Sequence, residues 1–111
     1  MADHDRIEKD LESRLLESSI YYKDIHTCIE FKVRGKAGEC DVIAIHDRYA
    51  VLIEIKGRNK PKNRYKARYQ LTKDIAWVRD KYPQVTRIFP LYAYTDNNSR
   101  RYSIDWYPNL V

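Results

Sequence analysis

The spacing of apolar side chains along the chain predicts two amphipathic helices. One spans about residues 5–19, with Asp3 or Asp5 as its capping residue. The other spans about residues 64–82 and is ended by Pro83. Within each range, apolar residues recur every three or four positions, which places them on one face of a helix. The two faces consist of Ile7, Leu11, Leu15 and Leu16 in the first helix and of Leu71, Ile75, Val78 and Tyr82 in the second.

Short apolar segments outside these helices predict five strands. Tyr49–Lys56 is apolar on both faces as far as Glu54, which is typical of a central strand covered by helices on both sides. Val85–Tyr94 contains Pro90, and because proline lacks the amide hydrogen of a sheet ladder, we expect an edge position or a bulge there. The other predicted strands are Thr27–Val33, Glu39–His46 and Arg101–Tyr107.

Glycine, proline and polar residues separate these elements. Arg34–Gly38 is the expected hairpin loop, Gly57–Asn63 an expected polar loop, and Asp96–Ser99 an expected turn. The resulting order is α-β-β-β-α-β-β, without a repeat or a linker. We therefore predict one α/β domain over residues 1–111, with a central mixed sheet flanked by helices.

Length, hydropathy and cysteine content limit the class of protein. The 111 residues suffice for one hydrophobic core. The longest strongly apolar stretch, Ile88–Tyr94, is far shorter than the roughly 20 residues of a membrane-spanning helix, and the N-terminus has no apolar signal segment. The two cysteines are expected as reduced thiols, and a symmetric hairpin would place Cys40 opposite Lys32. We expect no membrane partner and an intracellular location: the cytoplasm, the nucleoid or, for a viral chain, the host cell.

The basic residues are concentrated in one segment. Residues 56–68 contain seven lysines and arginines and no acidic residue, whereas the rest of the chain has 14 basic and 16 acidic residues. Tyr65 and Tyr69 interleave with these charges, and basic plus aromatic surface suits contact with nucleic acid. The alternatives are a solvated charged loop and, for the tyrosines, packing in the core. The candidate DNA contacts are Arg58, Lys60, Lys62, Arg64, Lys66 and Arg68.

Carboxylates occur at the ends of two strands that are otherwise apolar. Asp41 begins the apolar part of one strand, and Glu54 and Lys56 end the next. A buried carboxylate is costly unless it is paired or binds a cation, so a structural ion pair is one interpretation. The other is an oxygen-rich site for Mg²⁺ or Mn²⁺. His4, His26 and His46 lack the spacing of a zinc site, and we assign them no role.

The pattern Asp41…Glu54-Ile55-Lys56 resembles the PD-(D/E)XK nuclease superfamily, in which an aspartate begins one strand and E-x-K ends the next. The segment 38–44 is similar to a G-E-x-D-hydrophobic-hydrophobic-A signature of small members. The opening Glu8-x-x-Leu11 is similar to that of archaeal Holliday-junction resolvases. Two positions depart from family patterns: Cys40 replaces the proline of Pro-Asp, and Asp74 replaces the tyrosine of the RecB-like Q-x-x-x-Y, which argues against a RecB-type enzyme.

The resemblance implies a restriction-endonuclease-like α-β-β-β-α-β core with an extra C-terminal strand. It also implies a metal held by Asp41, Glu54, the Ile55 carbonyl and Glu8, with Lys56 activating water. Glu12 is an alternative to Glu8, and one metal or two remain open. Glu39, which is otherwise a hairpin-end surface residue, and Gln70, otherwise a residue at the core edge, are possible additional site residues.

The expected function is that of a divalent-metal-dependent DNA endonuclease acting on branched DNA in recombination or repair. The resolvase-like opening implies a homodimer, because such enzymes match the two-fold symmetry of a junction. The terminal strand either offers an apolar dimer surface or only covers the sheet; its apolar residues are Tyr102, Ile104, Trp106 and Tyr107. The alternatives are a nuclease for nicked, flap or single-stranded DNA, and a non-catalytic nucleic-acid-binding module with a degenerate site. The residues alone do not distinguish RNA from DNA.

Overall fold

The computed structural model describes residues 3–17, 24–33, 35–95 and 101–111. The predicted order of elements is confirmed, and the central strand has the predicted bounds. The predicted turn at 96–99 and the predicted helix end at Ser19 lie outside the described residues. The elements are α1 (Asp3–Glu17), β1 (Asp24–Val33), β2 (Lys36–Ile45), β3 (Tyr49–Lys56), α2 (Pro61–Lys81), β4 (Arg87–Thr95), β5 (Tyr102–Trp106) and a 3₁₀ turn (Pro108–Leu110).

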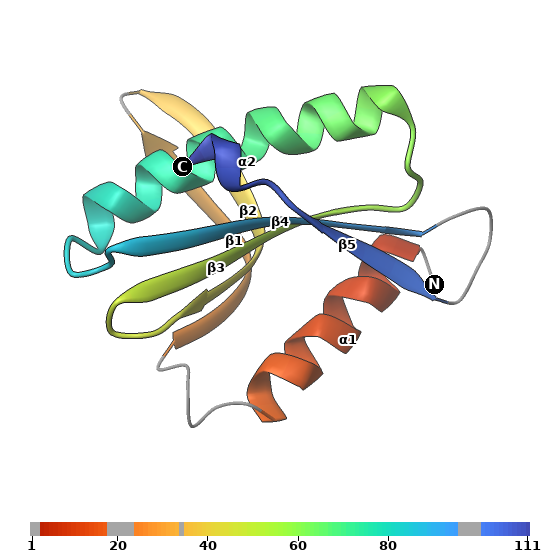
Figure 1. Cartoon of the computed structure of the whole chain (residues 1–111), viewed down its shortest axis with the longest axis horizontal. Coiled ribbons are helices and arrows are strands. Elements are labelled where there is room, and N and C mark those ends of the chain that lie inside the picture. The colour runs from red at the N-terminus through yellow and green to blue at the C-terminus, as the bar shows by residue number, and fades with distance from the viewer. Residues whose placement is uncertain (1–2, 18–23, 34, 96–100) are drawn as a thin grey trace.

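The five strands form one mixed sheet in the order β1-β2-β3-β4-β5. The strands β1, β2 and β3 pair antiparallel, β3 and β4 pair parallel, and β5 pairs antiparallel with β4. The parallel pair requires a crossover, and α2 provides it. Figure 1 shows α1 and α2 on opposite faces of the sheet. No helix in the described ranges is long and apolar enough to cross a membrane.

Two hydrophobic cores, one on each face, explain why the middle of the sheet is apolar throughout. Leu52 of β3 packs with Leu71, Ile75 and Val78 of α2. Its neighbour Ile53 belongs to the other core, beneath α1. Successive side chains of a strand point to opposite faces, so a strand between two helices must be apolar on both. This second core consists of Ile7, Leu11, Val42, Ile53, Ile55 and Ala93.

The prediction that Pro90 marks an edge or a bulge is wrong. Pro90 is buried in β4, between β3 and β5. Its carbonyl accepts a hydrogen bond from the Tyr107 N–H at 2.9 Å, and the nitrogen of a strand residue points to the same side as its carbonyl. The missing N–H therefore faces away from β3. It falls beside the end of the β4–β5 ladder, whose terminal pair is Leu91 with Trp106.

Two predicted boundaries are corrected by local backbone chemistry. The helix α2 begins at Pro61 rather than Arg64, because proline is favourable in the first turn, where its absent N–H would have no helical partner. The first hairpin is tighter than predicted, with Val33 paired to Lys36 and Gly35 at φ 79°. Cys40 consequently lies opposite Ile29 rather than Lys32.

Candidate functional site

The candidate site lies where β2 and β3 separate. Their ladder ends at the pair Val42 and Ile53, so Asp41 and Glu54 come directly after it. The Ile55 N–H donates to Asp41 Oδ2 at 2.8 Å. The Asp41 carboxylate thus replaces a main-chain carbonyl as the acceptor for the Ile55 N–H, and this hydrogen bond stabilises the two strands where they separate. The Ile55 carbonyl faces the same side as its N–H, which is the side of Asp41.

One cavity of about 390 Å³ brings most of the predicted site residues together. Its lining includes Glu39 and Asp41 from β2, Glu54 and Lys56 from β3, and Gln70 from α2. These five positions span 32 residues of sequence. The crossover through α2 and the β2–β3 turn bring them to one wall. The remaining lining residues are His4, Tyr65, Lys66 and Tyr69.

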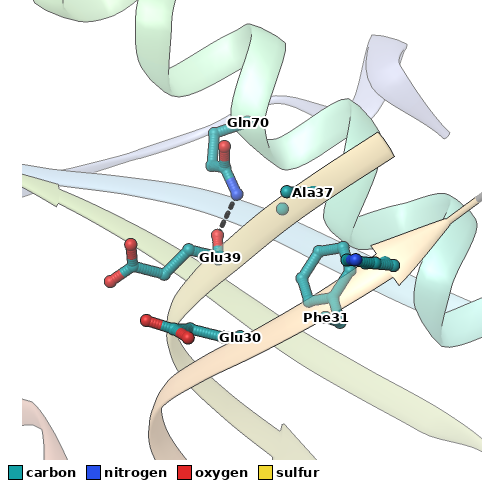
Figure 2. Close-up of a pocket in the computed structure, with 7 residues that line it drawn as sticks. Glu30, Phe31, Ala37, Glu39 and Gln70 are labelled. Atoms are coloured by element: carbon teal, nitrogen blue, oxygen red, sulfur yellow. Dashed lines mark hydrogen bonds between the residues drawn. The ribbon is translucent and has the colours of Figure 1, made fainter. Parts of the chain in front are cut away.

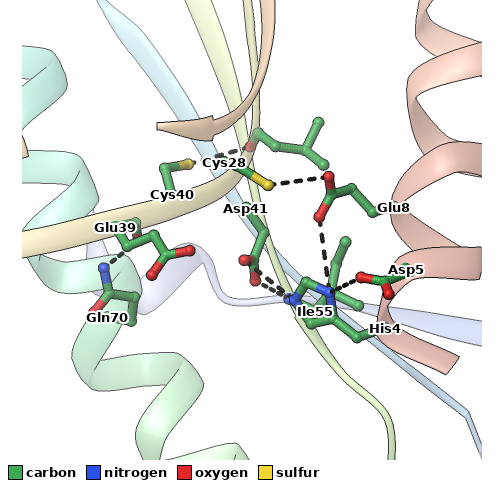
Figure 3. A network of polar contacts seen from close by, with 10 residues as sticks. His4, Asp5, Glu8, Cys28, Glu39, Cys40, Asp41, Ile55 and Gln70 are labelled. Atoms are coloured by element: carbon green, nitrogen blue, oxygen red, sulfur yellow. Dashed lines mark hydrogen bonds and ion pairs between the residues drawn. The ribbon is translucent and has the colours of Figure 1, made fainter. Parts of the chain in front are cut away.

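The helix α1 contributes Glu8 to the edge of this site. One Glu8 oxygen accepts a hydrogen bond from Cys28 Sγ at 3.1 Å, and the other lies 3.7 Å from His4 Nδ1 (Figure 3). Cys28 has φ 53°, a left-handed conformation that non-glycine residues seldom adopt. The hydrogen bond to Glu8, and then burial, raise the pKa of the Cys28 thiol to about 11, so it remains protonated and donates.

Glu8 rather than Glu12 is near Asp41. Ligand atoms of His4, Glu8 and Asp41 all lie within 4.8 Å of one another, and we call these three residues the outer cluster. Glu12 is half-buried and lies one turn further along α1, outside this cluster. Of the two predicted helix carboxylates, Glu8 is therefore the one that lies beside Asp41 and His4.

His4, to which the sequence analysis assigned no role, is part of the site. Its Nε2 lies 3.2 Å from Asp41 Oδ1 (Figure 3). The spacing of His4 and Glu8, four residues apart at a helix start, places both on one face of α1. The spacing therefore marks His4 as a candidate site residue wherever Glu8 is one.

A second set of acidic groups lies deeper, and we call Cys40, Glu54 and Asp74 the inner cluster. Their ligand atoms are also within 4.8 Å of one another. Glu54 is 3% exposed and Asp74 0%. Glu54 Oε1 and Asp74 Oδ2 are buried without a hydrogen-bond partner among the described residues. Burial and the charge of Asp41 raise the pKa values of both carboxyls, and the charge of Asp74 raises that of Glu54 further.

Asp74 is the second residue that sequence reasoning missed. It lies on the apolar face of α2, between the buried Leu71 and Ile75. An acidic residue at i+3 in a stripe of apolar positions is unusual unless it has a partner. The Gln70 amide nitrogen donates to Asp74 Oδ1 at 3.3 Å and also to the Glu39 carbonyl. Gln70 therefore links the inner cluster to the edge of β2.

Gln70 also lines a neighbouring hollow of about 610 Å³. Figure 2 shows Gln70 reaching from α2 to Glu39, with Glu30, Ala37 and Phe31 along the hairpin β1–β2. Both spaces share Glu39 and Gln70 as lining residues. The hairpin surface is thus continuous with the candidate site.

The basic segment begins in the cavity and continues along the start of α2. Tyr65 is 74% exposed and Tyr69 55%, so the interpretation of these tyrosines as core residues is wrong. Lys66 lines the cavity beside them. The predicted contacts Arg58, Lys60, Lys62, Lys66 and Arg68 are exposed, and Arg64 is half-buried.

Two of these basic residues have partners within the chain. Arg64 Nη1 donates to Asn59 Oδ1 at 3.2 Å. The Arg68 guanidinium lies over the Tyr107 ring, 4.9 Å from its centre. These contacts restrain both side chains along the surface beside the cavity.

A scan of family models and a search of curated proteins returned no match to this chain. The case for an activity therefore depends on the residues of the site and their arrangement.

Proposed function

We propose that this chain is a divalent-metal-dependent DNA endonuclease with a PD-(D/E)XK site. The observation that carries the proposal is that Asp41, Glu54 and Lys56 line one cavity at the point where two neighbouring strands part. The resemblance found in the sequence requires this placement of the strand aspartate and of E-x-K. The element order α-β-β-β-α-β also agrees with it.

The donor set fits a divalent cation. Asp41 and Glu8 supply carboxylate oxygens, and the orphaned oxygen of Glu54 is a buried acceptor that a cation would satisfy. The Ile55 carbonyl faces the side of Asp41 and completes an oxygen-rich donor set, which suits Mg²⁺ or Mn²⁺. These residues would hold the ion. When bound, it would offset negative charge on the scissile phosphate.

Lys56 and the surrounding residues have the positions for phosphodiester hydrolysis. The Lys56 ammonium, in the same cavity as Asp41 and Glu54, would orient the attacking water and stabilise charge on the phosphate. The water oxygen gives up a proton to solvent and bonds to phosphorus as the bond to one sugar oxygen breaks, and the departing oxygen takes up a proton from solvent. Glu39 and Gln70 line the same cavity and would position the strand being cut.

The exposed basic segment would bind the DNA backbone. Its charges and the exposed Tyr65 and Tyr69 border the cavity, so a DNA backbone with one phosphate in the cavity would extend directly over this surface. Such contacts provide affinity that is independent of base sequence and sensitive to salt.

Branched DNA is our first choice of substrate, and recombination or repair inside the cell is the corresponding process. The edge strand β5 exposes Ile104 and Trp106, the latter to 57%. An apolar edge strand is a ready pairing surface for a second copy. A symmetric dimer would present two cavities to a two-fold symmetric junction.

The decisive experiment compares cleavage of linear, nicked, single-stranded and four-way-junction DNA with Mg²⁺, with Mn²⁺ and with EDTA. We expect metal-dependent cleavage, fastest on the junction, that is lost in Asp41→Asn and retained in the control Asp80→Asn, which changes an exposed residue at the end of α2. Preference for nicked, flap or single-stranded DNA would change the substrate but keep the chemistry. DNA binding without cleavage under every metal condition would instead indicate a non-catalytic module.

A further inference from the structure

The position of His4 bears on which metal the site takes. Its Nε2 is 3.2 Å from Asp41 Oδ1, and its Nδ1 is 3.7 Å from Glu8 Oε2. The side chain is 36% exposed and lines the cavity that contains Asp41, Glu54 and Lys56. Figure 3 shows the imidazole between the carboxylates of Asp41 and Glu8. A nitrogen ligand is therefore within the site proposed above.

The spacing of the outer cluster suits coordination. The candidate ligand atoms lie within 4.8 Å of one another. Two atoms that each lie about 2.0–2.2 Å from one shared ion are also less than 4.8 Å apart. Imidazole binds first-row transition metals well, whereas Mg²⁺ prefers oxygen ligands and gives up its water reluctantly. Two carboxylates without a histidine would show little such preference.

We propose that His4 is a metal ligand, and that it makes this site select a first-row transition metal such as Mn²⁺ over Mg²⁺. The inference rests on the proposed function for the identity of the site, but metal binding can be measured without DNA or cleavage. The competing explanation is that His4 only pairs with Asp41 in the metal-free protein. In that case, removing His4 would alter affinity for both metals alike or for neither.

The test uses the full chain, stripped of metal, with Mn²⁺ as the probe. Electron paramagnetic resonance of free Mn²⁺ measures its affinity, and displacement by Mg²⁺ gives the affinity for Mg²⁺. We compare the wild type with His4→Gln and with the matched control His26→Gln, which changes an exposed histidine of β1. Thermal unfolding in EDTA checks that both variants are folded.

We expect His4→Gln to lose about 10-fold to 100-fold in Mn²⁺ affinity, with little change in Mg²⁺ affinity. A loss of this size is known for residues that only support a metal ligand, and loss of a ligand itself should cost at least as much. His26→Gln should match the wild type. Pulsed resonance of the bound Mn²⁺ should show coupling to a histidine nitrogen in the wild type and in His26→Gln, but not in His4→Gln. The wild-type spectrum alone keeps the test decisive if His4→Gln does not fold.

The failures of the two proposals are distinguishable. Cleavage that depends on a metal, with no nitrogen coupling and an unchanged ratio of Mn²⁺ to Mg²⁺ affinity in His4→Gln, would overturn the role of His4 alone. An equal loss for both metals would also overturn it, because His4 would then only position Asp41. Mn²⁺ bound through His4 without cleavage of any of the four DNA forms would overturn the nuclease and leave the metal site.

Discussion

The outer and inner clusters have similar composition and opposite environments. Each contains two carboxylates and one softer ligand, a histidine in the outer cluster and a cysteine in the inner one. In the outer cluster, Asp41 and Glu8 accept hydrogen bonds or pair with His4. In the inner cluster, Glu54 and Asp74 are buried, and each has an oxygen without a partner.

The difference shows that the number of carboxylates does not by itself define a binding site. In the outer cluster, His4 and Glu8 are partly exposed and both carboxylates have partners, so the cluster is accessible to an incoming ion. Burial, with the nearby charge of Asp41, favours the protonated form of both inner carboxyls, as the raised pKa values indicate. Glu54 belongs to the inner cluster and also lines the cavity, so it connects the two environments.

The largest expected effect comes from breaking the outer cluster at Asp41. Asp41→Asn removes a negative ligand with almost unchanged shape, and we expect cleavage to fall by roughly 10³-fold, since metal stabilisation contributes several kcal/mol. Glu54→Gln should give a similar loss. Single-turnover rates at saturating Mg²⁺ measure both, with circular dichroism to check the fold. Near-normal turnover in either variant would place the metal elsewhere.

The next prediction separates the site from the basic segment. Lys56→Ala should lose catalysis and retain most DNA affinity, because Lys56 lies in the cavity. The triple variant Lys60→Ala, Lys62→Ala and Arg64→Ala should do the reverse. Its log–log salt dependence should flatten by about one unit per lost phosphate contact.

Affinities across a salt series, together with single-turnover rates at saturating protein, test this division. An unchanged salt slope in the triple variant would show that the segment is only a solvated charged surface.

A smaller effect should distinguish the two carboxylates of α1. Glu8→Gln should reduce activity more than Glu12→Gln, because only Glu8 lies within 4.8 Å of the Asp41 and His4 ligand atoms. The two variants serve as controls for each other, since both remove one charge from the same helix. Cleavage rates at one fixed metal concentration decide the ranking, and the opposite order would move the site one turn along α1.

The smallest expected effect concerns the inner cluster and appears in stability. The pKa of Asp74 is raised in the folded protein by burial. The folded state therefore binds more protons than the unfolded state between the ordinary carboxyl range and about pH 7, so metal-free stability should be lower at about pH 8 than at about pH 5. Asp74→Asn should flatten this dependence and stabilise the protein at pH 8 by about 1–2 kcal/mol.

Denaturant unfolding in EDTA at the two pH values measures this effect. A wild-type stability that rises with pH would mean that the inner carboxyls are ionised and paired in the fold.

The sequence predicted those features that depend on local pattern. The apolar run of Tyr49–Lys56 predicted its bounds, and a strand buried on both faces follows from the two cores. Pro90 misled because its effect depends on which side of β4 its nitrogen faces, and this is set by the pairing with β5. Nothing in the local sequence specifies that pairing.

The missed site residues depended on tertiary placement in different degrees. The proximity of His4 to Asp41 arises from the way α1 crosses the sheet, which the helix pattern does not determine. Asp74 carried a local signal, since it interrupts the buried face of α2. A rule that treats acidic residues on an apolar stripe as candidates would have found it.

The division of the molecule into two cores has a consequence for its local unfolding. The helix α1 is held by the smaller core, through Ile7 and Leu11, and by the Tyr102 hydroxyl, which donates to Asp10. Its undocking would leave the larger core beneath α2 in place while removing His4 and Glu8 from the site. Segments with few buried contacts open below the global free energy of unfolding. Amide hydrogens of α1 should therefore exchange sooner than those of β3. An ion bound by the outer cluster would join α1 to β2 and slow the exchange of the α1 amides by linkage.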